Sequence, residues 1–147
     1  MIIYLGADHA GYAFKERAKR LLTKLDRNLS VIDLGNTKID ELDDYPRYAD
    51  KVAKSVASDE DSLGLLFCGT GSGMCIAANK TKSIRAVSVS TVKEARLSRE
   101  HNAANVLCLG QRVMTWRVAR HIIKSWLETP TSYEARHLRR VRQLNRL

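Results

Sequence analysis

The clearest signal of the fold lies in residues 63–80, Leu63-Gly-Leu-Leu-Phe-Cys-Gly-Thr-Gly-Ser-Gly-Met-Cys-Ile-Ala-Ala-Asn-Lys80. Its first part, which ends at Cys68, is a short apolar run typical of a strand buried on both faces of a parallel sheet. From about Gly73 the residues favour a helix. A strand, a glycine-rich turn and a helix in this order direct backbone N–H groups at one point, where the helix dipole adds positive potential. The sequence therefore predicts an anion site at the turn 69–73.

The glycine spacing separates this turn from two common nucleotide motifs. It is G-x-G-x-G rather than the G-x-G-x-x-G of dinucleotide-binding folds, and Met74 follows Gly73 where a P-loop would continue with Lys. ATP binding therefore has little support. A nucleotide-linked oxidoreductase stays open as an alternative, because Glu94 lies about twenty residues further on, near the place of a ribose-binding acid. A tight turn without function is the other alternative.

The rest of the chain alternates apolar strands with amphipathic helices. We expect strands at 2–7, 30–34, 63–68, 85–90 and 105–109, and helices at 14–25, 46–56, from about 73, 92–100, 118–127 and 133–145. Strands that alternate with helices form a parallel sheet covered on both faces. The expected fold is α/β: a three-layer, Rossmann-like, five-stranded parallel sheet with a basic C-terminal helix, in one domain over residues 1–147.

Composition narrows the class of protein. Of the 147 residues, 44% are hydrophobic and 28% are charged, as in soluble globular domains. No apolar run approaches the length of about eighteen residues that spans a membrane, so no membrane partner is expected. Residues 1–7 are apolar but lack a preceding basic region, which is unlike a signal peptide. Three cysteines without metal-ligand spacing predict a cytoplasmic protein with no metal, and Cys75 and Cys108 are expected in the core.

The net charge of +9 is unevenly distributed. Residues 117–147 hold eight Lys and Arg side chains against Glu128 and Glu134. Such an excess suits either nucleic acid or a small acidic substrate. Few aromatic side chains interrupt the basic tail, so no stacking platform for single strands is visible, although a nucleic-acid-binding module stays an alternative. Arg136 and Arg140 are four residues apart on one side of a helix, which suits a phosphate as well as a solvated face.

Reactive residue types follow several of the predicted strands. Ligands of such folds bind outside the carboxyl ends of the strands, where the sequence places Asp8, His9, residues 68–73 and residues 110–112. The turn after the fourth strand could bring His101 and Asn102 to the same edge. Cys68, at the start of a turn that leads into a helix, is a candidate thiolate base or nucleophile, and Thr70 is a candidate proton carrier beside it.

Several motifs together resemble the type B ribose-5-phosphate isomerases, a family shared with sugar-phosphate isomerases of the galactose-6-phosphate type. The resemblance covers nearly the whole chain in order. The motifs are Asp8-His9-Ala10-Gly11, Asp44-Tyr45-Pro46, Cys68-Gly69-Thr70-Gly71-Ser72-Gly73 with Ile76-Ala77-Ala78-Asn79-Lys80, Ser98-Arg99-Glu100-His101-Asn102 and Asn105-Val106-Leu107-Cys108-Leu109-Gly110.

The resemblance implies an aldose–ketose isomerase without metal or cofactor that interconverts ribose 5-phosphate and ribulose 5-phosphate. A six-carbon sugar 6-phosphate is the alternative substrate. In that family pattern Cys68 looks like the base that moves a proton between C1 and C2, and Thr70 would assist at the oxygens. His101 would be the acid in ring opening. The resemblance also implies a homodimer or homotetramer with sites shared between subunits. Nucleic acid is not an expected partner.

The same resemblance implies a set of substrate-binding residues. Asp8 and Asn102 would hold hydroxyls, and the backbone of Gly69, Gly71, Ser72 and Gly73 would stabilise the enediolate. The phosphate would be held by His9, Arg112, Arg136 and Arg140, and Tyr45 would contact the substrate. The chain departs from the family pattern at Glu134-Ala135-Arg136-His137, where the family has Gly-Gly-Arg-His, and at residues 36–42 and 88–94. These departures leave the placing of Arg136 and the preferred sugar open.

Overall fold

A five-stranded parallel sheet forms the middle layer of the protein. The computed structural model describes all residues, 1–147. The strands are β1 (Ile2–Ala7), β2 (Ser30–Asp33), β3 (Ser62–Cys68), β4 (Ala86–Ser88) and β5 (Val106–Gly110). Their order across the sheet is β2-β1-β3-β5-β4, and every neighbouring pair is parallel. The predicted parallel α/β sheet is confirmed.

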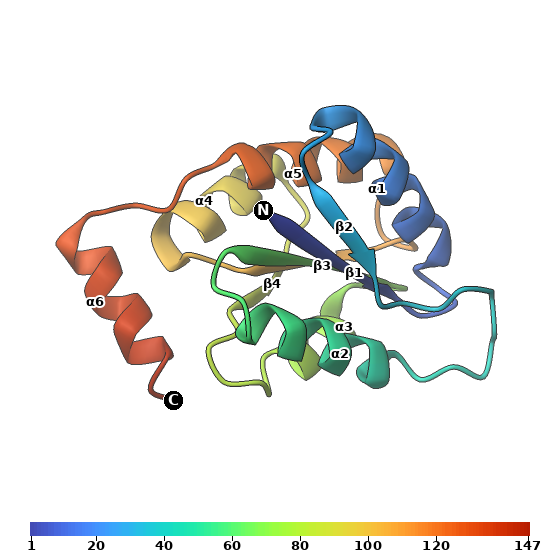
Figure 1. Ribbon diagram of the computed structural model, residues 1–147, viewed down its shortest axis with the longest axis horizontal. Coiled ribbons are helices and arrows are strands. Elements are labelled where there is room, and N and C mark those ends of the chain that lie inside the picture. Colours follow the sequence, from blue (N-terminus) through green and yellow to red (C-terminus); the bar gives the residue numbers. More distant parts are fainter.

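Helices cover both faces of this sheet (Figure 1). They are α1 (Tyr12–Leu25), α2 (Tyr45–Ala57), α3 (Ser72–Ala78), α4 (Val92–Asn102), α5 (Trp116–Glu128) and α6 (Ala135–Leu144). Side chains of α1, α4 and α5 share one core with the sheet, and those of α2 and α3 share the other. The three-layer prediction is therefore confirmed. None of the helices is long and apolar enough to cross a membrane.

The central strand β3 joins the two cores. All seven of its residues are buried. Leu65 and Phe67 pack into the core under α1 and α5, whereas Leu66 and Cys68 pack into the core under α2 and α3. This is why the sequence of β3 is a continuous apolar run rather than an alternating one. The strand also brings its neighbours into register, with Ala7 beside Phe67 and Cys68 beside Gly110.

The boundaries around α4 differ from those expected. Strand β4 is shorter than the predicted range 85–90, because Thr91 already acts as the N-cap of α4. Its hydroxyl accepts the N–H of Glu94, and the Glu94 carboxylate accepts the N–H groups of Ser90 and Thr91 at 2.8 and 3.0 Å. This reciprocal capping box accounts for Glu94 without a ribose. At its other end α4 continues through Asn102, two residues beyond the predicted end.

Helix α6 stands apart from the three layers and packs against α4 (Figure 1). It covers the predicted range 133–145 only in part, since it begins at Ala135 and ends at Leu144. Its C-terminal end is tied to the body of the protein by Arg85, whose guanidinium donates to the side-chain oxygen of Asn145 at 2.7 Å. The basic C-terminal helix is thus present as predicted, with most of its side chains exposed.

A lysine lies fully buried between α1 and β2. The Lys15 side chain has no exposed surface, and its ammonium donates to Asp33 and Glu16. Lys19 also donates to Asp33, at 2.9 Å. Burial raises the pKa of Asp33, but the hydrogen bonds from Lys15 and Lys19 outweigh burial and bring this pKa below its ordinary value. An ammonium is tolerated in such a place only when carboxylates pair with it.

We therefore expect Asp33→Asn to lower the free energy of unfolding by about 2–4 kcal/mol, because it leaves Lys15 with Glu16 as its one remaining carboxylate. The contribution of Asp33 should be present above its unfolded pKa of about 3.9 and be lost as the pH falls through its lower folded pKa. Urea unfolding at pH 7 and pH 3 measures both effects.

The matched control is Asp50→Asn, which removes an exposed pair with Lys54. Exposed pairs contribute below about 1 kcal/mol, so this variant should unfold close to the wild type. Equal losses in the two variants would contradict the role given to Asp33.

Candidate active site at the carboxyl edge of the sheet

Three strand ends meet at the centre of the carboxyl edge. Asp8 follows β1, Cys68 ends β3 and Gly110 ends β5. The β5 end is tied to the β3 end by two backbone bonds of 2.9 Å, from the N–H of Gln111 to the Cys68 oxygen and from the N–H of Arg112 to the Gly69 oxygen. The predicted gathering of residues 8–9, 68–73 and 110–112 at one edge is confirmed.

The glycine turn wraps its own backbone around the Cys68 thiol. Cys68 is 5% exposed, and its sulfur accepts the N–H of Gly71 at 3.1 Å. Gly71 has φ +83°, and a Cβ there would lie 2.8 Å from the Ser88 hydroxyl. Only glycine combines this left-handed backbone with so close an approach. An N–H group aimed at sulfur is an arrangement that suits a thiolate.

Side chains from two other segments lie over the turn. The Arg112 guanidinium lies against Gly69, where a Cβ would be 3.3 Å from Nη1. The Tyr45 ring, at the start of α2, packs on Gly73 more closely still, since a Cβ there would be 2.8 Å from Cζ of the ring. Thr70 and Ser72 are exposed, so their hydroxyls are open to a ligand. The structure therefore places a thiol, two hydroxyls, a guanidinium and a phenol around one turn.

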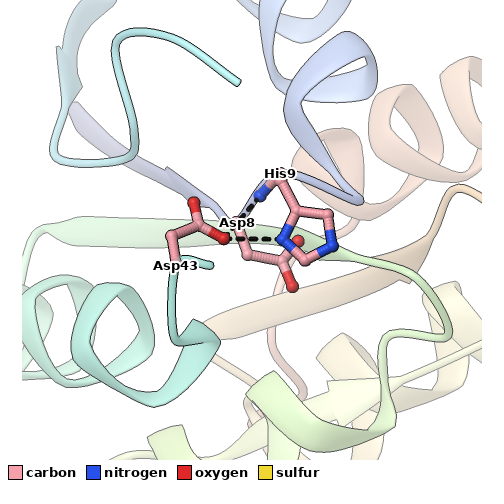
Figure 2. Close-up of side chains that lie close together, drawn as sticks. All are labelled: Asp8, His9 and Asp43. Atoms are coloured by element: carbon pink, nitrogen blue, oxygen red, sulfur yellow. Dashed lines mark hydrogen bonds and ion pairs between the residues drawn. The ribbon is translucent and has the colours of Figure 1, made fainter. Parts of the chain in front are cut away.

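A hydrogen-bonded cluster of Asp8, His9 and Asp43 lies at the end of β1 (Figure 2). Asp43 Oδ1 is 2.7 Å from Nδ1 of His9 and also accepts the backbone N–H of His9 at 3.0 Å. Asp8 accepts the N–H of Gly11 at 3.0 Å. Burial raises the pKa of Asp8, and the Gly11 N–H and the nearby His9 oppose this rise. The cluster combines acceptors with one imidazole nitrogen that faces away from Asp43.

The same cluster contains the residues best placed to hold a metal ion. One possible ligand atom from each of Asp8, His9 and Asp43 lies within 4.8 Å of the others. The hydrogen bonds just described already engage one oxygen of each carboxylate and Nδ1 of His9, and Asn36 donates to the second oxygen of Asp43 at 3.1 Å. A metal ion would have to displace several of these bonds, so the cluster has the character of a hydrogen-bonding site.

His101 and Asn102 do not reach this edge within one chain, and the expectation that a turn would bring them there is wrong. They form the last turn of α4, which runs back along the sheet before β5 begins at Val106. The next residues pair at the amino end of the sheet, where Asn105 accepts the N–H of Gly64. Eleven helical residues carry the chain about 16 Å, which is enough to return it to the opposite edge.

Arg136 and Arg140, the two arginines of α6 predicted to hold the phosphate, are also remote from Cys68. Both are exposed, and Arg136 pairs with Glu134 at 2.7 Å. His137 of α6 is buried, and its ring lies 4.5 Å from the ring of His101, centre to centre. The predicted site residues thus form two groups: one around Cys68, and a second made by the end of α4 and by α6.

Sequence reasoning missed one residue of the site, Asp43. Asp43 lies in the aperiodic segment 36–45, where no pattern distinguishes a buried acid from exposed ones, yet its side chain is 2% exposed. Cys75, expected in the core with Cys108, packs against the core that contains Cys108 and is half-buried. A hydrogen bond with the Cys108 thiol lowers the pKa of Cys75 to about 7. The pKa of Cys108 is raised, and the largest cause is the complete burial of its thiol.

Comparison with known proteins places this arrangement in a family. The chain is 45% identical over 140 residues to a ribose-5-phosphate isomerase B of Escherichia coli, covering 95% of this chain and 91% of that protein. It is 43% identical over 125 residues to a D-erythrulose-4-phosphate isomerase 2 of Mycolicibacterium smegmatis, covering 85% and 82%. The crystal structure of a Mycoplasma genitalium ribose-5-phosphate isomerase B with bound ribulose-5-phosphate matches with a TM-score of 0.91 and 39% identity, over 99% of this chain and 94% of that one. Residues 3–144 also match the family model described as Ribose/Galactose Isomerase, and the chain belongs to this family.

Proposed function

We propose that the protein is an aldose–ketose isomerase that interconverts ribose 5-phosphate and ribulose 5-phosphate. The observation that carries the proposal is the Cys68 thiol, held in a glycine turn beside Arg112 and close to the strand end that bears Asp8 and His9. A base next to groups that bind anions and hydroxyls suits proton transfer on a phosphorylated sugar. The names of the Escherichia coli and Mycoplasma genitalium relatives support this substrate.

The proton transfer needs only this chain's own groups. The Cys68 thiolate takes the proton from C2 of the open-chain aldose, and the carbonyl oxygen at C1 gains the negative charge of an enediolate. Thr70, which is exposed beside the thiol, moves the hydroxyl proton between the two oxygens. The Cys68 thiol then returns its proton to C1, which leaves the carbonyl at C2. The reverse reaction uses the same groups in the opposite order.

Stabilisation of the intermediate falls to the turn 69–73. The first N–H groups of a helix have no partner within that helix, and α3 begins at Ser72. Donors fixed in place before the reaction stabilise a developing oxyanion without reorganisation.

The phosphate and the sugar hydroxyls have separate candidate partners at this edge. Arg112 and His9 are the candidates to bind the phosphate, and Asp8 is the candidate acceptor for a sugar hydroxyl.

The remaining predicted site residues require a second copy of the chain. His101 and Asn102 cannot reach Cys68 of their own chain, because α4 returns them to the other edge. Arg136 and Arg140 lie on α6, which packs against α4 and stands outside the layers. Helix α6 also leaves apolar side chains uncovered, since Leu138 is 37% and Leu144 is 44% exposed. In a two-fold dimer each chain offers the same surface, so both sites would be completed at once. We therefore propose a homodimer whose sites combine Cys68 of one chain with α4 and α6 of its partner.

A four-carbon sugar phosphate is the second candidate substrate. The Mycolicibacterium smegmatis relative is named for D-erythrulose 4-phosphate and is as similar to this chain as several relatives named for ribose 5-phosphate. The segments 36–42 and 88–94, which border the site at Asp43 and Ser88, depart from the family pattern and would decide the length of the sugar.

The purified protein should convert ribose 5-phosphate to ribulose 5-phosphate at a rate that EDTA does not change. Parallel assays with D-erythrulose 4-phosphate and with allose and galactose 6-phosphates give kcat/KM for each chain length. A higher kcat/KM for one of the other sugars would mean that this sugar, and not ribose 5-phosphate, is the preferred substrate. Loss of activity in EDTA would refute the metal-free mechanism.

Cys68→Ala should lower kcat by about 10²–10⁴-fold, the usual contribution of a positioned acid or base. Steady-state kinetics with ribose 5-phosphate measures it. The matched control is Cys75→Ala, which removes a neighbouring thiol of lowered pKa that has no part in the mechanism and should keep kcat within about threefold. Near-normal turnover in Cys68→Ala would refute the assignment of the base.

Two inactive variants should restore activity when mixed. Chains with Cys68→Ala and chains with His101→Ala are each expected to be inactive, but a mixed dimer holds one site with both residues intact. After unfolding and refolding together in equal amounts, statistical pairing predicts about a quarter of wild-type activity. No recovery, in a mixture shown to exchange subunits, would mean that the two residues do not share a site across the dimer.

A further inference from the structure

We propose that Asp43 is the positioning residue of His9: it holds the imidazole through Nδ1, so that Nε2 is the ring atom presented to the phosphoryl group of the substrate. Asp43 lies outside the motifs of the family resemblance, in the segment that joins β2 to α2. The inference rests on the proposed role of His9 at the phosphate and deepens it.

The contacts of Asp43 are those of a fixed support. Its side chain is 2% exposed, against 27% for His9. One oxygen accepts both the backbone N–H of His9 at 3.0 Å and the Nδ1 of its ring at 2.7 Å. The other oxygen accepts the Asn36 amide at 3.1 Å. The carboxylate is thus held from two sides, while the ring it holds stays partly open to a ligand.

The hydrogen bond also decides which ring nitrogen is free. An ionised carboxylate is only an acceptor, so Nδ1 of His9 must be the donor in the 2.7 Å contact. Nε2 lies on the far side of the ring from Asp43 (Figure 2). A protonated ring can then donate Nε2–H to a phosphate oxygen while Asp43 balances its charge, and no other ring atom competes for the ligand.

Asp8 has a different part in the cluster. Its carboxylate accepts a hydrogen bond from the N–H of Gly11. It also lies close enough to His9 and Asp43 for electrostatic interaction with both. Asp8 has no hydrogen bond with either nitrogen of the His9 ring, whereas Asp43 has one. Asp43 is therefore the residue that sets the orientation and tautomer of His9.

The tautomer can be read directly from ¹⁵N chemical shifts of the His9 ring in the free protein. Wild-type His9 in its neutral form should show a protonated Nδ1 and an unprotonated Nε2. In Asp43→Ala this pattern should be lost in favour of a mixture. The measurement needs neither substrate nor turnover, so it stands even where the protein proves to isomerise another sugar. An unchanged tautomer in Asp43→Ala would overturn the proposal.

The effect on the ligand is measured with inorganic phosphate by calorimetry and, as KM against kcat, with ribose 5-phosphate. Asp43→Ala should raise the Kd of phosphate and the KM by about tenfold, the range of a hydrogen bond to a charged group, with kcat within about threefold. In a His9→Ala background the same substitution should change Kd by less than about twofold. Equal effects in both backgrounds would show a general structural role and overturn the proposal.

Two further variants separate the ring contact from loop anchoring. Asn36→Ala removes the support on the other oxygen of Asp43 but leaves the hydrogen bond to His9, so the tautomer should persist and Kd should change by less than about twofold.

Should Asp43→Ala fail to fold, Asp43→Asn keeps the shape of the side chain and removes its charge. It should raise Kd by about threefold or more in the wild type and leave it unchanged beside His9→Ala. Wild-type protein that does not bind phosphate would refute the role of His9, while the ring tautomer would still test Asp43.

Discussion

Close contact between backbones at the end of β3 is the constraint on which the site depends. A Cβ at Gly11 would lie 2.1 Å from the Phe67 oxygen, and one at Gly110 would lie 2.5 Å from the carbonyl carbon of Thr70. No side chain fits at either position. The start of α1 and the end of β5 can therefore press directly on the β3 end, and this brings Asp8, Cys68 and Arg112 to the same place. Without these glycines the strand ends would be spread apart, and the thiol would lose the groups around it.

The second feature of the molecule is the division of its predicted site residues between two edges of the sheet. The carboxyl edge holds the thiol, the glycine turn and the cluster of Asp8, His9 and Asp43. The end of α4 and helix α6 hold His101 and the basic side chains. Parallel sheets impose this division, because every connecting helix must run back to the amino edge before the next strand begins. The homodimer proposed above would bring the two groups together.

Charge has separate roles in the two regions. The buried pair of Lys15 and Asp33 fixes α1 on β2. Helix α1 begins directly after the turn 8–11, which contains Asp8 and His9. The net charge of +9 is concentrated in α5, α6 and the residues that follow, where arginines are exposed on a helix that stands outside the layers. A phosphorylated sugar explains an excess of this kind as well as a nucleic acid does, and the family favours the sugar.

The parallel α/β fold follows from the amino-acid pattern alone, because the fully apolar β3 and the alternation of strands with amphipathic helices have few other solutions. The same pattern predicts the group around Cys68, since residues that directly follow parallel strands must share an edge. The positions of His101 and Asn102 could not be predicted in this way, because they depend on how many turns α4 completes. The burial of Asp43 depends on long-range contacts with His9 and Asn36, which no local pattern encodes. An irregular loop has no periodicity to reveal which of its acids faces inward, so that choice belongs to packing rather than to pattern.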